Sequence, residues 1–154
     1  MSIIIKTVSS KKDFMTFARF ANKLYKGNKY YVPSMPMDDL STFSKEKNAA
    51  FEFSDAEFYL AYKDGEVVGR VAAIINHKAN DAWKVKQVRF GWIDFIDDLE
   101  VSAALLDAVI EFGRKAGMTQ IVGPLGFTDF DPEGMLVEGY DRLSTMALIY
   151  NHPY

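Results

Sequence analysis

Clustered carboxylates mark the stretch GPLGFTDFDPEGMLVEGYD, which spans residues 123–141. Within it, Asp131 and Glu133 are the candidate catalytic residues, because carboxyl groups held close together have raised pKa values and can accept a proton. A cluster of negative charge also favours the binding of a cation such as a protonated amine. The residues of this stretch that we expect to contact a substrate are Phe127, Asp129 and Tyr140.

Two other interpretations apply to the same carboxylates. Asp129, Asp131 and Glu133 reproduce the start of a calcium-binding loop, but Tyr140 stands at the twelfth position, where a bidentate Glu belongs. We therefore predict no metal site. The second interpretation is structural, and the sequence favours it: Asp129 and Asp131 would accept hydrogen bonds from nearby backbone N–H groups, and Pro132 would begin a helical turn.

Composition and motifs exclude several functional classes. The chain has no cysteine, which removes thiolate metal sites and cysteine nucleophiles. It contains no phosphate-binding loop, dinucleotide-binding motif or nucleophile elbow, and its two isolated histidines are interpreted as structural. Scattered basic residues argue against nucleic acid, and the apolar runs fall short of the ~18 residues of a membrane span. With no signal-peptide pattern at the start, we predict a cytoplasmic protein without nucleic-acid or membrane partners.

Local patterns predict a mixed sheet with helices on its faces, an α/β (α+β) fold. Asp64-Gly65 is typical of a type I′ turn between two strands of an antiparallel hairpin. Gly91, inside a later strand, indicates a bulge or a close approach by another backbone or a ligand. A strand, helix, strand order over residues 85–123 favours parallel pairing. The expected strands are residues 3–8, 56–63, 66–77, 85–96 and 118–122.

Capping patterns locate the helices. Ser10 and Asp13 can form a capping box at the start of a helix that ends near Gly27. Asp97 and Glu100 suggest a second box, before a helix that ends at Gly117, and residues 36–43 could form a helical turn. We expect one domain over residues 1–154. In it an aromatic arm (28–54) packs over the core or, as the less favoured alternative, over a ligand, and a loop region (123–154) follows the last strand.

This order of elements resembles the first two-thirds of the GNAT superfamily of acyl-CoA-dependent N-acyltransferases. The segments LYKGNKYYVPS, FYLAYKDGEVVGRVAAIINH, RFGWIDFIDD and GPLGFTDFDPEGMLVEGY are similar to a bacterial family of GNAT-like proteins. The resemblance implies a mostly antiparallel GNAT-like sheet that is incomplete at its C-terminal end, because a GNAT core continues beyond the fifth strand. The bare strand edge would favour a homodimer.

The resemblance also implies a function: an N-acyltransferase domain that acts on an amine-bearing small molecule and uses acetyl-CoA or another acyl-CoA. The strand at 86–96 would offer backbone groups to the pantetheine of the cofactor, and the next helix would receive its pyrophosphate. The cofactor-binding residues implied in this way are Trp92, Ile93, Asp94, Asp98 and Ser102.

The loop before that helix departs from the family pattern. It reads Ile-Asp-Asp-Leu-Glu-Val-Ser, with neither the glycines nor the arginine of the family, and residues 94–141 hold eleven acidic residues against two basic ones. Carboxylates at a helix N-terminus occupy its N–H groups and repel phosphate. We therefore expect a degenerate acyl-CoA site. The alternative function is a non-catalytic ligand- or partner-binding module on a GNAT scaffold, which would need no cofactor.

Overall fold

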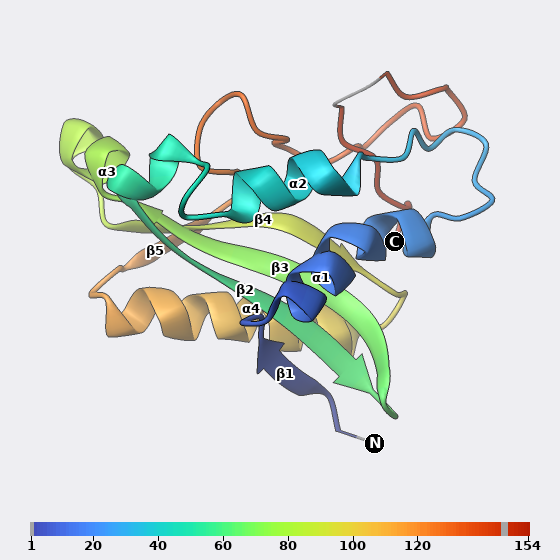
Figure 1. Cartoon of the computed structure of the whole chain (residues 1–154), viewed down its shortest axis with the longest axis horizontal. Helices are drawn as coiled ribbons and strands as arrows, with labels where there is room; N and C mark the ends of the chain where they lie inside the picture. The colour runs from blue at the N-terminus through green and yellow to red at the C-terminus, as the bar shows by residue number, and fades with distance from the viewer. Residues whose placement is uncertain (1, 146–147) are drawn as a thin grey trace.

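The structure, a computed structural model, describes residues 2–145 and 148–154 and contains one five-stranded sheet (Figure 1). The strand order is β1-β2-β3-β4-β5, with three antiparallel pairings followed by a parallel pairing of β4 with β5. The mixed, mostly antiparallel fold predicted from the sequence is thereby confirmed. The strands are β1 (Ile4–Thr7), β2 (Ser54–Lys63), β3 (Glu66–Asn76), β4 (Gln87–Phe95) and β5 (Gln120–Val122).

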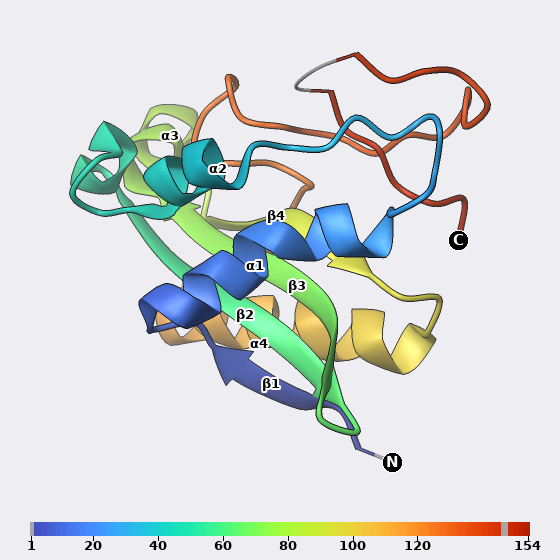
Figure 2. The same ribbon diagram turned by 45° about the vertical axis from the view of Figure 1, so that its right-hand side comes forward.

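Helices cover both faces of this sheet, as predicted (Figure 2). Helix α1 (Lys11–Leu24) and helix α2 (Pro36–Phe43) cover one face, and helix α4 (Leu99–Lys115) covers the other. A short 3₁₀ helix, η1 (Ala49–Glu52), precedes β2, and helix α3 (His77–Trp83) follows β3. No helix in the described part of the chain has the length and apolar character needed to cross a membrane.

The helix caps confirm one prediction and correct another. At α1 the Asp13 N–H donates to Ser10 Oγ at 3.1 Å, and the Ser10 N–H donates to Asp13 Oδ2 at 3.3 Å, which completes the capping box. At α4 the predicted cap was wrong by one residue. The cap is Asp98 rather than Asp97, and its Oδ1 accepts the Glu100 N–H at 2.9 Å.

Helix α3 was not predicted, because the polar segment after β3 has no apolar periodicity. No α3 residue is buried, so packing leaves no pattern in its sequence. Local capping supports the helix instead: the Ala79 N–H donates to Asn76 Oδ1 at 2.8 Å, and Lys84 ends the helix in the left-handed conformation. His77, expected at the end of the strand, is the first residue of this helix.

The core lies on both sides of β3. On the α4 face, Val101, Leu105 and Val109 are fully buried. They pack against alternate residues of β3, and Gly69 allows α4 to approach the sheet, because a Cβ atom there would lie 2.8 Å from Leu105 Cδ1. On the α1 face, Phe17 meets its neighbouring aromatic rings edge to face. The nearly continuous apolar run of β3 thus reflects burial on both faces.

A bulge in β4 changes which side chains point to each face. The register passes from Ala72 opposite Gly91 to Arg70 opposite Asp94, so three steps along β4 match two along β3. Trp92 takes up the extra residue with a φ of +45°. One inserted residue inverts the alternation of side chains beyond it, and this inversion places Asp94 on the α1 face beside Arg70.

Gly91 also allows the close approach that its position predicts. A Cβ atom at Gly91 would lie 2.6 Å from the carbonyl oxygen of Leu125, which belongs to the segment after β5. The Leu125 N–H donates to the Phe90 carbonyl oxygen at 2.9 Å. The chain after β5 therefore folds directly onto the bulged part of β4.

The aromatic arm and the segment after β5 lie side by side at one end of α1 (Figures 1 and 2). Tyr30 and Tyr31 pack with Tyr25 and Tyr150, and Phe43 is buried in the core, so the prediction that the arm packs over the core is confirmed. The helical turn predicted at Pro132 does not form.

Candidate functional site

A pocket of about 370 Å³ opens where α1, the arm and the segment after β5 meet over the bulged part of β4. Trp92, Ile93 and Asp94 line it from β4, and Arg70 lines it from β3. It is also lined by residues of the arm and α2, by residues 124–135 and by residues 148–151. A ligand in this pocket would therefore contact β4 at the point where the bulge redirects its side chains.

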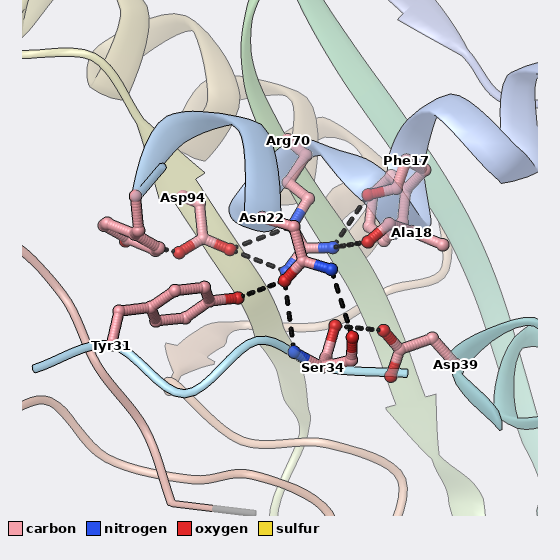
Figure 3. A network of polar contacts seen from close by, with 9 residues as sticks. Phe17, Ala18, Asn22, Tyr31, Ser34, Asp39, Arg70 and Asp94 are labelled. Atoms are coloured by element: carbon pink, nitrogen blue, oxygen red, sulfur yellow. Dashed lines mark hydrogen bonds and ion pairs between the residues drawn. The ribbon is translucent and has the colours of Figure 1, made fainter. Parts of the chain in front are cut away.

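A buried ion pair occupies one side of the pocket. Arg70 Nε and one terminal nitrogen both lie 2.8 Å from Asp94 Oδ2, and the two residues are 5% and 8% exposed (Figure 3). Arg70 also donates to the carbonyl oxygen of Phe17 at 2.7 Å, and Tyr25 Oη donates to Asp94 Oδ1 at 2.6 Å. Burial, reinforced by Asp94, raises the pKa of Tyr25, so its hydroxyl stays protonated. Both oxygens of Asp94 are thus engaged, which suits a structural carboxylate.

Asn22 of α1 fixes the arm across the pocket (Figure 3). Its Oδ1 accepts the Tyr31 hydroxyl at 2.6 Å and the Ser34 N–H at 3.1 Å, and its Nδ2 donates to the Ser34 carbonyl oxygen at 3.0 Å. The Ser34 hydroxyl in turn donates to Asp39 Oδ2 at 2.8 Å. Burial raises the pKa of Asp39, which lines the pocket from α2.

The structure separates the two candidate catalytic carboxylates. Asp131 lines the pocket, while Glu133 is exposed and stands outside the lining. Asp131 Oδ2 accepts the Thr128 N–H at 3.1 Å, and the Asp131 N–H donates to the Thr128 carbonyl oxygen at 3.1 Å. Burial raises the pKa of Asp131. Asp131 therefore closes a turn, as the structural interpretation predicted for it.

Two of the three predicted substrate contacts, Phe127 and Tyr140, do not line the pocket. Phe127 is 0% exposed and packs on Phe51 and Trp92, so its prediction as a substrate contact is corrected to a core residue. Tyr140 donates to the Leu136 carbonyl oxygen at 2.7 Å and stands outside the lining.

Asp129, the third predicted contact, is exposed and also stands outside the lining. Its neighbourhood bears on the calcium interpretation as well. Over residues 2–145 and 148–154, no three His, Asp or Glu side chains gather as metal ligands would. Asp129 thus has neither a pocket contact nor a cluster of ligands around it within that range.

The segment after β5 makes hydrogen bonds to β4 and β3 directly beyond the pairing of β4 with β5. Their pairing ends at Arg89 and Val122. The Arg89 side chain then donates to the carbonyl oxygens of Gly126 and Phe127 at 3.0 and 3.1 Å. Asn76 donates to the second of these oxygens at 2.9 Å. The chain itself therefore covers this part of β4, and the pocket is lined farther along the strand by Trp92–Asp94.

The N-terminus of α4 does not fit a pyrophosphate group. Asp98 caps the helix and also pairs with Lys63, whose Nζ lies 2.6 Å from its Oδ2. This hydrogen bond lowers the pKa of Asp98, which keeps its carboxyl group ionised. Ser102 donates to the Leu99 carbonyl oxygen at 3.1 Å. Of the five residues implied as cofactor ligands, Asp98 and Ser102 thus lie at this acidic helix end, outside the pocket lining.

The sequence did not identify several pocket residues. Asp39 lies in no motif, and Tyr25, although it lies in the segment LYKGNKYYVPS, was not singled out as a site residue; only the fold brings the two together. Arg70 carried a signal that could have been used: it is the one charged residue in the otherwise apolar run VVGRVAAIIN. A charge inside a strand buried on both faces requires a buried partner, and that partner is Asp94.

Comparisons with known proteins give two relatives over nearly the whole chain. Protein YghO of Escherichia coli is 27% identical over 151 residues, which are 98% of this chain and 38% of the relative. The bacterial ceramide synthase of Caulobacter vibrioides is 26% identical over 155 residues, or 99% of this chain and 39% of the relative. The chain thus spans about two-fifths of the length of these relatives. No protein-family model matches it.

Solved structures give the fold. An acetyltransferase of the GNAT family from Staphylococcus aureus superposes with a TM-score of 0.53 at 16% identity, over 78% of this chain and 71% of that structure. It shares with this chain the mixed sheet with helices on both faces. The chain has the GNAT-type fold of these acetyltransferases.

Proposed function

We propose that this chain is an N-acyltransferase domain that transfers an acyl group from a thioester to an amine bound in the pocket. The observation that carries the proposal is the charge of the lining. Among the residues that the structure describes, four carboxylates line the pocket, and Arg70, the one cation among them, is already paired with Asp94. A protonated amine is attracted to such a site. The GNAT-type fold supports acyl transfer as the reaction.

The rim of the pocket favours an amine with an aliphatic part. Met35, Phe130, Met135 and Leu148 line the pocket and are 65%, 100%, 52% and 67% exposed. Large apolar side chains this exposed gain free energy when an alkyl chain covers them. One curated relative is named a bacterial ceramide synthase, and a ceramide is a long-chain amino alcohol acylated on nitrogen. This name supports a long-chain amine as the acceptor.

The proposed reaction joins the amine nitrogen to the thioester carbonyl carbon. The carbon–sulfur bond breaks, the sulfur leaves as a thiolate, and the products are an amide and a thiol. The acyl donor is a thioester, and acyl-CoA is the first to test because of the fold. We expect coenzyme A itself to bind weakly, because carboxylates occupy the N-terminus of α4, where the family places the pyrophosphate.

Thiol release tests the proposal directly. The purified chain is incubated with acetyl-CoA or palmitoyl-CoA and with a long-chain amino alcohol or a short polar amine. A thiol reagent then reports only product, because the protein has no cysteine. We expect amide and thiol in equal amounts with the long-chain amine, with mass spectrometry identifying the amide. Absence of amide with every CoA donor and with acyl carrier protein thioesters would overturn the proposal.

A non-catalytic binding module is the second candidate. The acidic start of α4 favours it, as do the hydrogen bonds by which the chain after β5 covers β4 beside β5. Calorimetry separates the two candidates: saturable binding of the amine without transfer from any thioester favours the module.

Pairing of two copies through the outer edge of β5 also stays a prediction, and light scattering over a range of concentrations tests it.

A further inference from the structure

We propose that Asp39, on α2, is the residue that accepts the proton of the acceptor amine. This inference rests on the proposed function and goes beyond it by replacing Asp131 and Glu133 as the candidate base. An amine at neutral pH is protonated and cannot attack a carbonyl carbon until it loses a proton. The residue that takes the proton must line the pocket and have a free carboxylate oxygen.

Two of the other three lining carboxylates meet these requirements poorly, and the third, Asp38, is exposed to solvent. Both oxygens of Asp94 are held, one by Arg70 and the other by Tyr25. Asp131 is fixed in its turn by the Thr128 N–H. Its side chain is also enclosed by backbone, because a Cβ atom on Gly126 would lie 2.3 Å from Asp131 Cβ. These two carboxylates hold the site together.

Asp39 differs from Asp94 because it is oriented without being saturated, and from Asp131 because a side-chain hydroxyl holds it rather than the backbone of its own turn. Its Oδ2 accepts the Ser34 hydroxyl at 2.8 Å, and Ser34 is itself held by the Asn22 amide (Figure 3). No residue that the structure describes donates a hydrogen bond to Asp39 Oδ1. The side chain is half-buried, whereas Asp38 beside it is exposed. Asp39 thus lines the pocket and has one oxygen to which no described residue donates.

The surroundings of Asp39 also suit proton transfer. Burial raises its pKa, and the like charges of Asp38 and Asp94 act in the same direction, while the Ser34 hydrogen bond and Arg70 oppose them. A base whose pKa is raised toward neutral holds the proton more readily than an exposed aspartate. The charged and titratable groups that face it are Asp38 on α2, Tyr31 in the arm, Arg70 on β3 and Asp94 on β4.

Acyl transfer begins when the amine loses a proton to Asp39. The ammonium group gives one proton to Asp39, and the freed nitrogen lone pair forms a carbon–nitrogen bond to the thioester carbonyl. When the tetrahedral intermediate collapses, the carbon–sulfur bond breaks and its electron pair leaves with sulfur. The excess proton on nitrogen passes to the thiolate, and Asp39 later returns its own proton to solvent.

Matched substitutions test this assignment. Asp39→Asn should lower kcat/KM about 100-fold, within the range that removal of a general base produces, and should abolish the rise of kcat/KM with pH on the acidic side. Asp39→Glu should recover part of the activity. Glu138→Gln, an exposed carboxylate of the segment after β5, is the control and should stay within twofold of the wild type.

Ser34→Ala gives a readout that a purely structural role would not move. Removing its hydrogen bond should raise the pKa of Asp39 and shift the acidic side of the pH profile to higher pH. Thermal unfolding of each variant checks that the fold is intact. An active wild type with Asp39→Asn within threefold of it overturns the inference while the proposed function stands. A folded Glu133→Gln variant that loses more activity than Asp39→Asn does the same. A wild type inactive with every thioester overturns both.

Discussion

The two faces of the sheet have opposite characters although they share the same strands. On the α4 face, helix and sheet meet through fully buried apolar side chains. On the α1 face, aromatic packing around Phe17 gives way at one end to the Arg70–Asp94 pair and a pocket. The α4 face is held by close packing, whereas the pocket end of the α1 face depends on satisfied polar groups.

The bulge in β4 explains why the two faces differ: it places a charged side chain, Asp94, beside Arg70 at one end of the α1 face. If the same residues of β4 continued in regular alternation beyond Gly91, Asp94 would lie opposite Gly69 and point toward α4, into the apolar core. An unpaired carboxylate there would be costly. With the bulge, Asp94 instead meets Arg70, and the strand contributes both to the core and to the pocket.

The largest effect is expected from breaking the buried ion pair on the α1 face. Arg70→Leu leaves Asp94 buried without its partner, and we expect a loss of about 3–5 kcal/mol in the free energy of unfolding, measured with urea. The double variant Arg70→Leu/Asp94→Leu should recover most of that loss, because no unpaired charge remains. A single variant less than 1 kcal/mol below wild type would contradict the view that the pair holds this end together.

An intermediate effect is expected on the apolar face. Leu105→Ala removes a fully buried side chain that packs over Gly69, and we expect about 3 kcal/mol of destabilisation from lost burial and the cavity left behind. Asp107→Ala, on the exposed side of the same helix, is the control and should stay within about 0.5 kcal/mol. If Leu105→Ala also changed the pH profile of activity, packing on the α4 face would influence the pocket, and the two faces would not act independently.

The smallest effect concerns the start of α1, and it depends on pH. The Lys6 amine, whose Nζ donates to Asp13 Oδ1 at 3.0 Å, and then Ser10, lower the pKa of Asp13 from 3.8 to about 2. A carboxyl pKa lowered by folding stabilises the folded state above about pH 4, and this contribution is lost as pH falls toward 2.

Ser10→Ala should therefore lower the free energy of unfolding by about 1 kcal/mol at pH 7 through loss of the cap. Lys6→Met should weaken the loss of stability between pH 4 and pH 2, because it removes the main cause of the lowered pKa of Asp13. Urea unfolding at several pH values measures both. An unchanged acid dependence in Lys6→Met would show that the ion pair does not hold α1 at the edge of the sheet.

Local chemistry made much of the fold predictable. The Asp64-Gly65 turn has the positive φ values of 53° and 81° that a type I′ turn requires. The capping box at Ser10 and the close approach at Gly91 also form as predicted, because each depends on residues near in sequence or on the lack of a side chain. Asp97 was mistaken for the cap of α4 because Lys63, distant in sequence, holds Asp98 instead.

The sequence alone predicts the five strands and the helices α1 and α4, because periodicity and caps are local properties of the chain. Which carboxylates line the pocket depends instead on tertiary contacts. The β4 bulge brings Asp94 to Arg70, the arm carries Asp39 to the same place, and the chain after β5 places Phe127 in the core and Glu133 in solvent. These positions depend on contacts between segments far apart in sequence, which no local pattern records.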